Sequence, residues 1–153
     1  MGDQPCSISF DRAAEYYDRT RRLTPQASAA MTELLAAEIG DRQPVLEIGV
    51  GTGLVSLPLH DGGVRMVGLD LSSGMVGKLI EKSGGRSPFP IVLGDATRLP
   101  FPDGAFGAAL VRHVLHLIPA WRHAVRELGR VVRPGGVLLL NIGARHWRVA
   151  RGR

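Results

Sequence analysis

Three glycines at alternate positions, just after an acidic residue, are the part of this sequence best suited to chemistry. In the stretch "PVLEIGVGTGL", an apolar run leads to Glu47, and Gly49, Gly51 and Gly53 follow. Such glycines let a ligand approach the backbone closely. A phosphate-binding P-loop would need a Lys and a Ser or Thr after the last glycine, and the chain has neither directly there. A dinucleotide fingerprint would need a glycine where Leu54 stands.

The acid before the glycines indicates a different kind of ligand. Glu47 would repel a pyrophosphate but would favour a positively charged group. The N-terminus of the helix expected after the turn would favour a carboxylate. A ligand with both an ammonium and a carboxylate satisfies both features, so the turn predicts an amino acid or a molecule that contains one.

Further polar residues follow the other predicted strands. Asp70 lies about 20 residues beyond Glu47, where the acid of dinucleotide-binding folds accepts hydrogen bonds from ribose hydroxyls. Asp95 follows a third strand, and Arg112 and His113 follow a fourth. Because ligands bind beyond the carboxyl ends of the strands in open α/β sheets, we expect these residues around one crevice.

The elements that would position these residues alternate between strand and helix. A helix is expected over 24–39, with Thr24 as its cap, Pro25 at its first position and Gly40 as its stop. A shorter helical segment, with Asp11 as a possible cap, precedes it. Strands are expected at 45–48, 64–71, 91–96, from 106, and at 137–143, with helices from about 53 to 59, from Ser72 or Ser73 to 80, and from 119 to 132. This order predicts a doubly wound, mostly parallel α/β sheet.

Length and composition favour one soluble domain over residues 1–153, with a helical cap at 1–40, an α/β core at 44–143 and a basic tail at 144–153. No apolar run approaches the roughly 20 residues of a membrane span, and no secretion signal is seen, so a cytoplasmic protein without membrane contact is expected. Cys6 is the single cysteine, which excludes an internal disulfide, and no Cys/His cluster predicts a metal.

The net charge of +5 is concentrated in the tail "RHWRVARGR", whose four arginines are Arg145, Arg148, Arg151 and Arg153. The rest of the chain is nearly neutral. A basic tail is usually solvated, so nucleic acid is not expected as a partner.

Five motifs in order resemble the class I S-adenosylmethionine-dependent methyltransferases, in particular their small-molecule group of the methyltransferase type 11 kind. The motifs are "VLEIGVGTG", "VGLDLSSGM", the two halves of "GDATRLPFPDGAFGAALVRHVLHLI", and "RVVRPGGVLLL". The resemblance covers roughly residues 10–143 and implies a Rossmann-like methyltransferase fold. It implies S-adenosyl-L-methionine as cofactor and methyl transfer to an O, N or C atom of a small-molecule acceptor.

The resemblance also implies roles for individual residues. Glu47 would help to hold the methionine end of the cofactor, and the three glycines would give it access. Tyr17, with Tyr16 beside it, belongs to a segment that folds over the cofactor in relatives. The remaining cofactor-binding residues would be Asp70 at the ribose, Leu71 beside it in the chain, Asp95 with Ala96 at the adenine, and Arg112 and His113 facing the crevice.

Each of these residues also has a purely structural interpretation. Glu47 could cap the turn, Asp70 could cap a helix, and Asp95 could form an Asx turn. His113 is a candidate base if the acceptor enters protonated, and otherwise it lines or packs the site. His116, within an apolar run, is expected to be structural, and the two tyrosines could pack the helix.

The end of the chain departs from the family, whose seven-stranded sheet has an antiparallel hairpin after the fifth strand. The tail predicts neither strand, so the strand at 137–143 is expected to be an exposed edge through which a homodimer could form. Truncation or a frameshift is one explanation, and a true short form is the other. The alternative functions are a cofactor-binding fragment or pseudoenzyme without catalysis, and a nicotinamide-dependent oxidoreductase, against which the glycine spacing and Glu47 argue.

Overall fold

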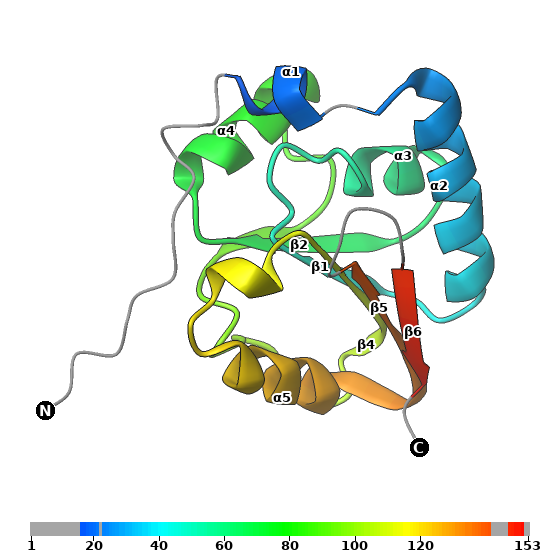
Figure 1. The fold of residues 1–153 in the computed structure, drawn as a ribbon, viewed down its shortest axis with the longest axis vertical. Helices are drawn as coiled ribbons and strands as arrows, with labels where there is room; N and C mark the ends of the chain where they lie inside the picture. The colour runs from blue at the N-terminus through cyan, green and yellow to red at the C-terminus, as the bar shows by residue number, and fades with distance from the viewer. Residues whose placement is uncertain (1–15, 22, 142–146, 152–153) are drawn as a thin grey trace, which may run out of the picture.

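The computed structural model describes residues 16–21, 23–141 and 147–151, which form helices around one central sheet (Figure 1). The predicted cap at Asp11 lies outside the described residues. The helices are α1 (Tyr17–Arg21), α2 (Pro25–Ile39), α3 (Ser56–Asp61), α4 (Ser73–Lys82) and α5 (Trp121–Val131), with a short 3₁₀ helix at Leu115–Leu117. Within the described residues, no helix has the length and apolar character needed to cross a membrane.

The sheet has six strands in the order β3-β2-β1-β4-β5-β6. Strands β1 to β5 run parallel, and β6 runs antiparallel to β5. The strands are β1 (Val45–Ile48), β2 (Met66–Asp70), β3 (Ile91–Leu93), β4 (Phe106–Arg112), β5 (Val132–Asn141) and β6 (Trp147–Arg151). The chain winds outward from β1 to β3 and then crosses to β4, so the predicted doubly wound α/β fold is confirmed, with its switch point between β1 and β4.

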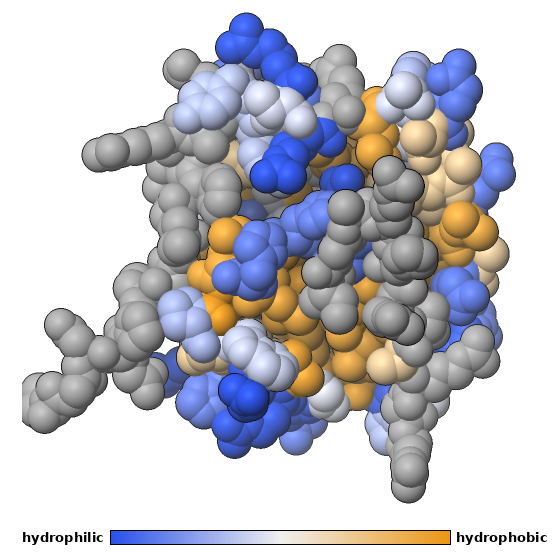
Figure 2. All heavy atoms as spheres, viewed as in Figure 1, coloured by the Kyte–Doolittle hydropathy of each residue, from blue (hydrophilic) through white to orange (hydrophobic). Residues whose placement is uncertain are grey.

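Two apolar cores cover the two faces of the sheet. One core joins alternate residues of the strands, such as Val45 and Leu110, to α2, α3 and α4. The other joins the intervening residues, such as Leu46 and Ala109, to α5. Figure 1 shows α5 on one side of the sheet and the other helices opposite. Figure 2 shows hydrophilic residues over α1 and α5 with hydrophobic residues between them.

The residues that were predicted to begin and end α2, and to cap α4, do so. The Thr24 hydroxyl accepts a hydrogen bond from the Ala27 N–H at 3.2 Å, and Pro25 begins α2. Gly40 ends that helix with a φ of 55°, which favours glycine. At α4 the cap is Ser72, whose hydroxyl accepts from the Met75 N–H at 3.1 Å.

The tail is where the prediction from sequence was wrong. Residues 147–151 form β6, and Asn141 to Val137 of β5 pair in register with Trp147 to Arg151. An open β5 edge would leave a row of backbone N–H and C=O groups without partners, and a short extended segment can satisfy them. The sheet edge therefore lies on β6, and the expected dimer through an exposed β5 edge loses its basis.

Some element boundaries also differ from those expected. The helix after the glycine turn begins at Ser56, because the positive φ angles of the turn are incompatible with a helix. The third strand ends at Leu93. The last strand expected at 137–143 begins earlier, at Val132, so residues 133–136 lie within β5, where the pairing with β4 shifts between Phe106 and Ala108.

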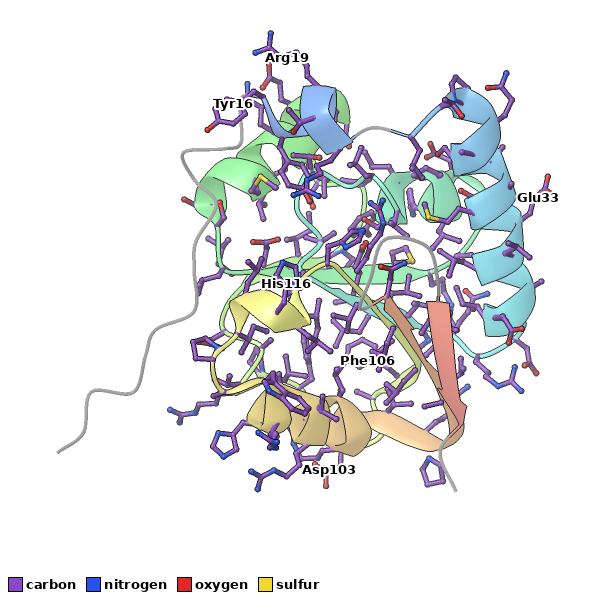
Figure 3. All side chains as sticks on the ribbon, in the orientation of Figure 1. Tyr16, Arg19, Glu33, Asp103, Phe106 and His116 are labelled. Atoms are coloured by element: carbon purple, nitrogen blue, oxygen red, sulfur yellow. The ribbon has the colours of Figure 1, made fainter. Side chains whose placement is uncertain are left out.

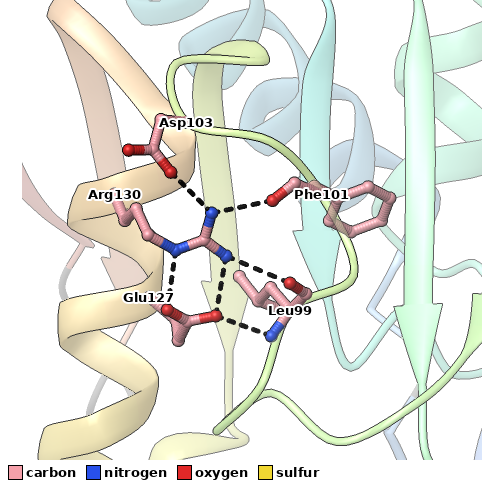
Figure 4. A network of polar contacts seen from close by, with 5 residues as sticks. All are labelled: Leu99, Phe101, Asp103, Glu127 and Arg130. Carbon is pink, nitrogen blue, oxygen red and sulfur yellow. Dashed lines mark hydrogen bonds and ion pairs between the residues drawn. The ribbon is translucent and has the colours of Figure 1, made fainter.

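One ion-pair network fixes the long loop after β3 (Figure 4). Arg130 of α5 makes a bidentate pair with Glu127, with both N···O distances at 2.8 Å. The same guanidinium donates to the carbonyls of Leu99 and Phe101 and to Asp103. The Leu99 N–H donates back to Glu127, so one helix turn holds the loop at several points.

Candidate cofactor site

A pocket opens at the carboxyl end of β1, above the glycine turn. It brings together five residues that the sequence predicted, from three separate segments of the chain. It is lined by Tyr17, Glu47, Gly49, Val50, Gly51, Thr52, Leu54, Val55 and Arg112. Its position beside the switch point of the sheet is where open α/β folds bind ligands.

The three glycines of the turn have different physical roles. All have positive φ, at 70° for Gly49, 55° for Gly51 and 82° for Gly53. A Cβ at Gly49 would collide with Val114, and one at Gly53 would lie 2.8 Å from Leu57 Cγ. The protein's own packing thus requires two of the glycines. At Gly51 the nearest side-chain atom would be Met75 Cε at 3.3 Å, so Gly51 is the glycine best placed for a ligand.

Glu47 is a buried acid with an unusual environment. Its side chain is 2% exposed in the middle of the sheet, and its Oε2 has no hydrogen-bond partner among the described residues. Burial raises the pKa of Glu47 to about 8, although Ser56 and the positive charge of Arg112 act in the opposite direction. A buried carboxyl that lacks a partner is costly. The site therefore has capacity for a donor or a cation from a ligand.

Asp70 holds the glycine turn in place. Its Oδ2 accepts a hydrogen bond from the Gly51 N–H at 2.7 Å, and its Oδ1 accepts from the Ser72 N–H at 2.8 Å. Ser72 is the helix cap, so the capping interpretation of Asp70 is wrong. Each carboxylate oxygen can accept a second hydrogen bond, which leaves a ribose contact chemically open. Leu71 beside it is 38% exposed, unusually for a leucine after a buried strand.

Asp95 and Ala96 are not among the residues that line this pocket. The Asp95 Oδ1 accepts from the Thr97 N–H at 2.8 Å, which is the Asx-turn geometry. Ala96 is 6% exposed and packs into the core on the α5 side. Their predicted contact with an adenine ring stays a prediction.

His113 adopts a strained backbone conformation at the end of β4. Its φ is 54°, and it is the one non-glycine residue with positive φ in the described part of the chain. Its N–H donates to the Asn141 carbonyl at 3.2 Å. Burial lowers the pKa of His113, and the charges of Arg112, Arg21 and His116 lower it further. The imidazole is therefore neutral at pH 7 and able to accept a proton.

His116 and the two tyrosines occupy different surroundings from one another. His116 is exposed on the 3₁₀ helix, so it does not pack into the core as its place in the apolar run suggested (Figure 3). Tyr16 is 49% exposed and points away from the protein. Tyr17 is half-buried in the pocket wall, where burial raises its pKa. The covering position predicted for Tyr17 fits its place there.

Sequence reasoning missed several residues around the turn. Thr52 is 1% exposed, and its hydroxyl donates to the Asp18 carboxylate of α1. The position of Thr52 between two glycines was a usable signal, whereas nothing in the sequence connects it to Asp18. Asn141 was missed as well: it is 8% exposed, and its Oδ1 has no hydrogen-bond partner within the part of the chain that the structure describes. Among the described residues, no cluster of three or more His, Cys, Asp or Glu side chains could hold a metal.

The fold and the site together define a known class. The methyltransferase domain family matches residues 46–140, and the chain belongs to this family. A demethylmenaquinone methyltransferase of Beutenbergia cavernae is 38% identical over 136 residues, which cover 86% of this chain and 55% of that protein. The chain thus spans little more than half the length of this relative.

Solved structures agree with the family. The CcbJ methyltransferase from Streptomyces caelestis superimposes with a TM-score of 0.69 at 27% identity, covering 85% of this chain and 55% of that one. The [4+2]-cyclase SpnF superimposes with a TM-score of 0.72 at 25% identity, covering 86% and 56%. Since one of these neighbours is named as a cyclase, the fold does not by itself fix a reaction.

Proposed function

We propose that this chain binds S-adenosyl-L-methionine in the pocket above the glycine turn and takes part in methyl transfer to a small-molecule acceptor. The observation that carries the proposal is Glu47, a buried acid beside an open glycine turn, with an oxygen that has no hydrogen-bond partner in the described part of the chain. An ammonium group in the pocket would supply the missing partner. Membership of the methyltransferase domain family supports the same cofactor.

The residues of the pocket, together with Asp70 and Leu71 at the end of the neighbouring strand β2, suit the parts of this cofactor. Glu47 would hold the ammonium group, while Gly51 would let the ligand lie against the backbone. Asp70 would accept hydrogen bonds from ribose hydroxyls, beside the exposed Leu71. Tyr17 would cover the ligand and exclude water, and Arg112 would balance the charge of Glu47.

When bound, the cofactor would supply an electrophilic methyl group carried on a sulfonium. For such a transfer the protein mainly orients the two reactants, since proximity and alignment provide a large part of the acceleration. His113 directly follows Arg112, which lines the pocket, and has a lowered pKa, so its neutral imidazole would take a proton from an acceptor that enters protonated. Its strained backbone is typical of residues held in place for function.

The names of the relatives support a class of acceptor. Several are demethylmenaquinone methyltransferases, at 34–38% identity over 86% of this chain. We therefore propose that the methyl acceptor is of the demethylmenaquinone type. We also propose that the protein is cytoplasmic. Because the match covers 55% of the relative, the acceptor side of the site is tested separately from the cofactor side.

Isothermal titration with S-adenosylhomocysteine tests the cofactor assignment, with NAD as the comparison ligand. We expect micromolar binding of S-adenosylhomocysteine, none of NAD, and loss of binding in Asp70→Ala. Absence of binding by the folded chain would refute the proposal. Methyl transfer is then measured with radiolabelled S-adenosylmethionine and demethylmenaquinone as the acceptor.

A further inference from the structure

Helix α1 is joined to the glycine turn and to α4 through one carboxylate. The Asp18 Oδ1 accepts a hydrogen bond from the Thr52 hydroxyl, and its Oδ2 accepts from Lys82 Nζ at 2.7 Å. The three residues come from α1, the turn and the last turn of α4. Asp18 and Lys82 are partly exposed, with side chains 21% and 32% accessible, whereas Thr52 is buried. Figure 1 shows α1 lying beside α4.

This junction adjoins the candidate cofactor site directly. Tyr17, the neighbour of Asp18, lines the pocket, and Thr52 lines it from the turn. Asp70 holds the same turn from β2 through the Gly51 N–H. Consecutive residues of the turn, Gly51 and Thr52, are therefore fixed by two different carboxylates, one on the sheet and one on the covering helix.

We infer that Asp18 is a positioning residue, which fastens α1 and its Tyr17 over the pocket and thereby retains a bound cofactor. Three features support this role. A buried hydroxyl bonded to a carboxylate makes a charge-assisted hydrogen bond, which is stronger than a neutral one. The ion pair with Lys82 fixes the second carboxylate oxygen and so the orientation of the first. A five-residue helix with no buried side chain has little packing of its own, so such polar contacts decide where it sits.

The inference rests on the proposed function and predicts a kinetic signature. A ligand beneath α1 leaves only when the helix lifts, so loss of the fastening should raise the dissociation rate more than it lowers the association rate. Loss of a hydrogen bond to a charged group corresponds to about a tenfold change in affinity. Lys82 acts through a partly exposed ion pair. Its contribution to slow ligand dissociation should therefore be smaller than that of the Thr52 hydrogen bond and should fall with added salt.

The test uses stopped-flow measurement of S-adenosylhomocysteine binding to the whole chain. Asp18→Asn removes the charge, Thr52→Val removes the hydroxyl at nearly constant shape, and Thr52→Ser restores it. Lys78→Met is the matched control, because Lys78 is on α4 but pairs with Glu81 of the same helix. We expect about tenfold faster dissociation in Asp18→Asn and Thr52→Val, with rates close to wild type in Thr52→Ser and Lys78→Met.

The possible results separate this inference from the proposed function. If the wild-type chain does not bind S-adenosylhomocysteine, the proposed function fails, and the role of Asp18 falls with it. If the wild-type chain binds and Asp18→Asn dissociates at the same rate, only the inference is overturned. A Thr52→Ser variant as weak as Thr52→Val would also overturn it, because the hydroxyl would then be irrelevant.

Discussion

Replacement of Glu47 by Gln should make the protein more stable at high pH and weaken its binding of the cofactor. In the folded protein the pKa of Glu47 is about 8, against an ordinary value of 4.5, because the side chain is buried in the sheet. The folded state therefore binds this proton more tightly than the unfolded state. The stabilisation that comes from this bound proton is fully present below pH 4.5 and is lost as the pH rises through 8.

The size of the effect follows from the shift in pKa. Each unit corresponds to about 1.4 kcal/mol, so the raised pKa of Glu47 lowers the free energy of unfolding, relative to its value in acid, by an upper limit of about 5 kcal/mol above pH 8 and by ~3 kcal/mol at pH 7. This is a large part of the roughly 5–15 kcal/mol that stabilises an ordinary domain. Glutamine has nearly the same shape and does not ionise, so Glu47→Gln should lack this loss.

Urea unfolding of both proteins at pH 5, 7 and 9 measures the difference. We expect the free energy of unfolding of Glu47→Gln, relative to wild type, to increase by a few kcal/mol between pH 5 and pH 9. Other titrating groups are the same in both proteins and cancel in the comparison. Parallel pH profiles would refute the reasoning, since they would mean that Glu47 ionises as easily when folded as when unfolded.

The Glu47→Gln substitution also has an expected effect on ligand binding, which is measured separately from stability. In the wild-type protein below pH 8, an ammonium group binds best after Glu47 releases its proton. The affinity for S-adenosylhomocysteine should therefore rise with pH up to about 8, by at most tenfold per unit, and then level off. In Glu47→Gln we expect weaker binding without this rise. The ligand's own ammonium titrates equally in both experiments.

Three further substitutions test other parts of the site and the fold. Gly51→Val places a β-branched residue at a φ of 55° and fills the open part of the turn, so it should abolish S-adenosylhomocysteine binding by titration, and unchanged affinity would mean that the turn does not contact the ligand. Asp70→Ala frees the Gly51 N–H and removes the proposed ribose acceptor, so it should lower both the affinity and the protection of the turn from hydrogen exchange; a loss of affinity alone would assign Asp70 to the ligand only. Arg130→Met should lower the melting temperature because it releases Glu127 and the carbonyls of the loop after β3, whereas Arg126→Met, on the exposed side of α5, should leave it unchanged. In wild-type protein the hydrogen bonds from Arg130 lower the pKa of Glu127 to about 2, so this stabilisation should disappear only in strong acid.

Much of the architecture was readable from the sequence because its signals are local. Continuous apolar runs between capped helices predicted a doubly wound sheet, and Thr24, Gly40 and Ser72 each do what their residue type indicates. The crevice was also predictable, since all parallel strands end at one edge. This placed Glu47 and Arg112 in the same pocket, although they are far apart in the chain.

What only the tertiary structure decided depends on contacts that the residue pattern does not show. The tail became β6 because the neighbouring strand β5 offered it unpaired backbone groups, and the tail itself carries no strong strand pattern. The need for glycine at positions 49 and 53 comes from Val114 and Leu57, whereas the sequence alone pointed to a ligand at all three positions. The junction of Asp18 with Thr52 and Lys82 joins three elements, and no spacing encodes it. The sequence determined which residue types are available for chemistry. Burial and packing determined which of these residues are held in position around the pocket.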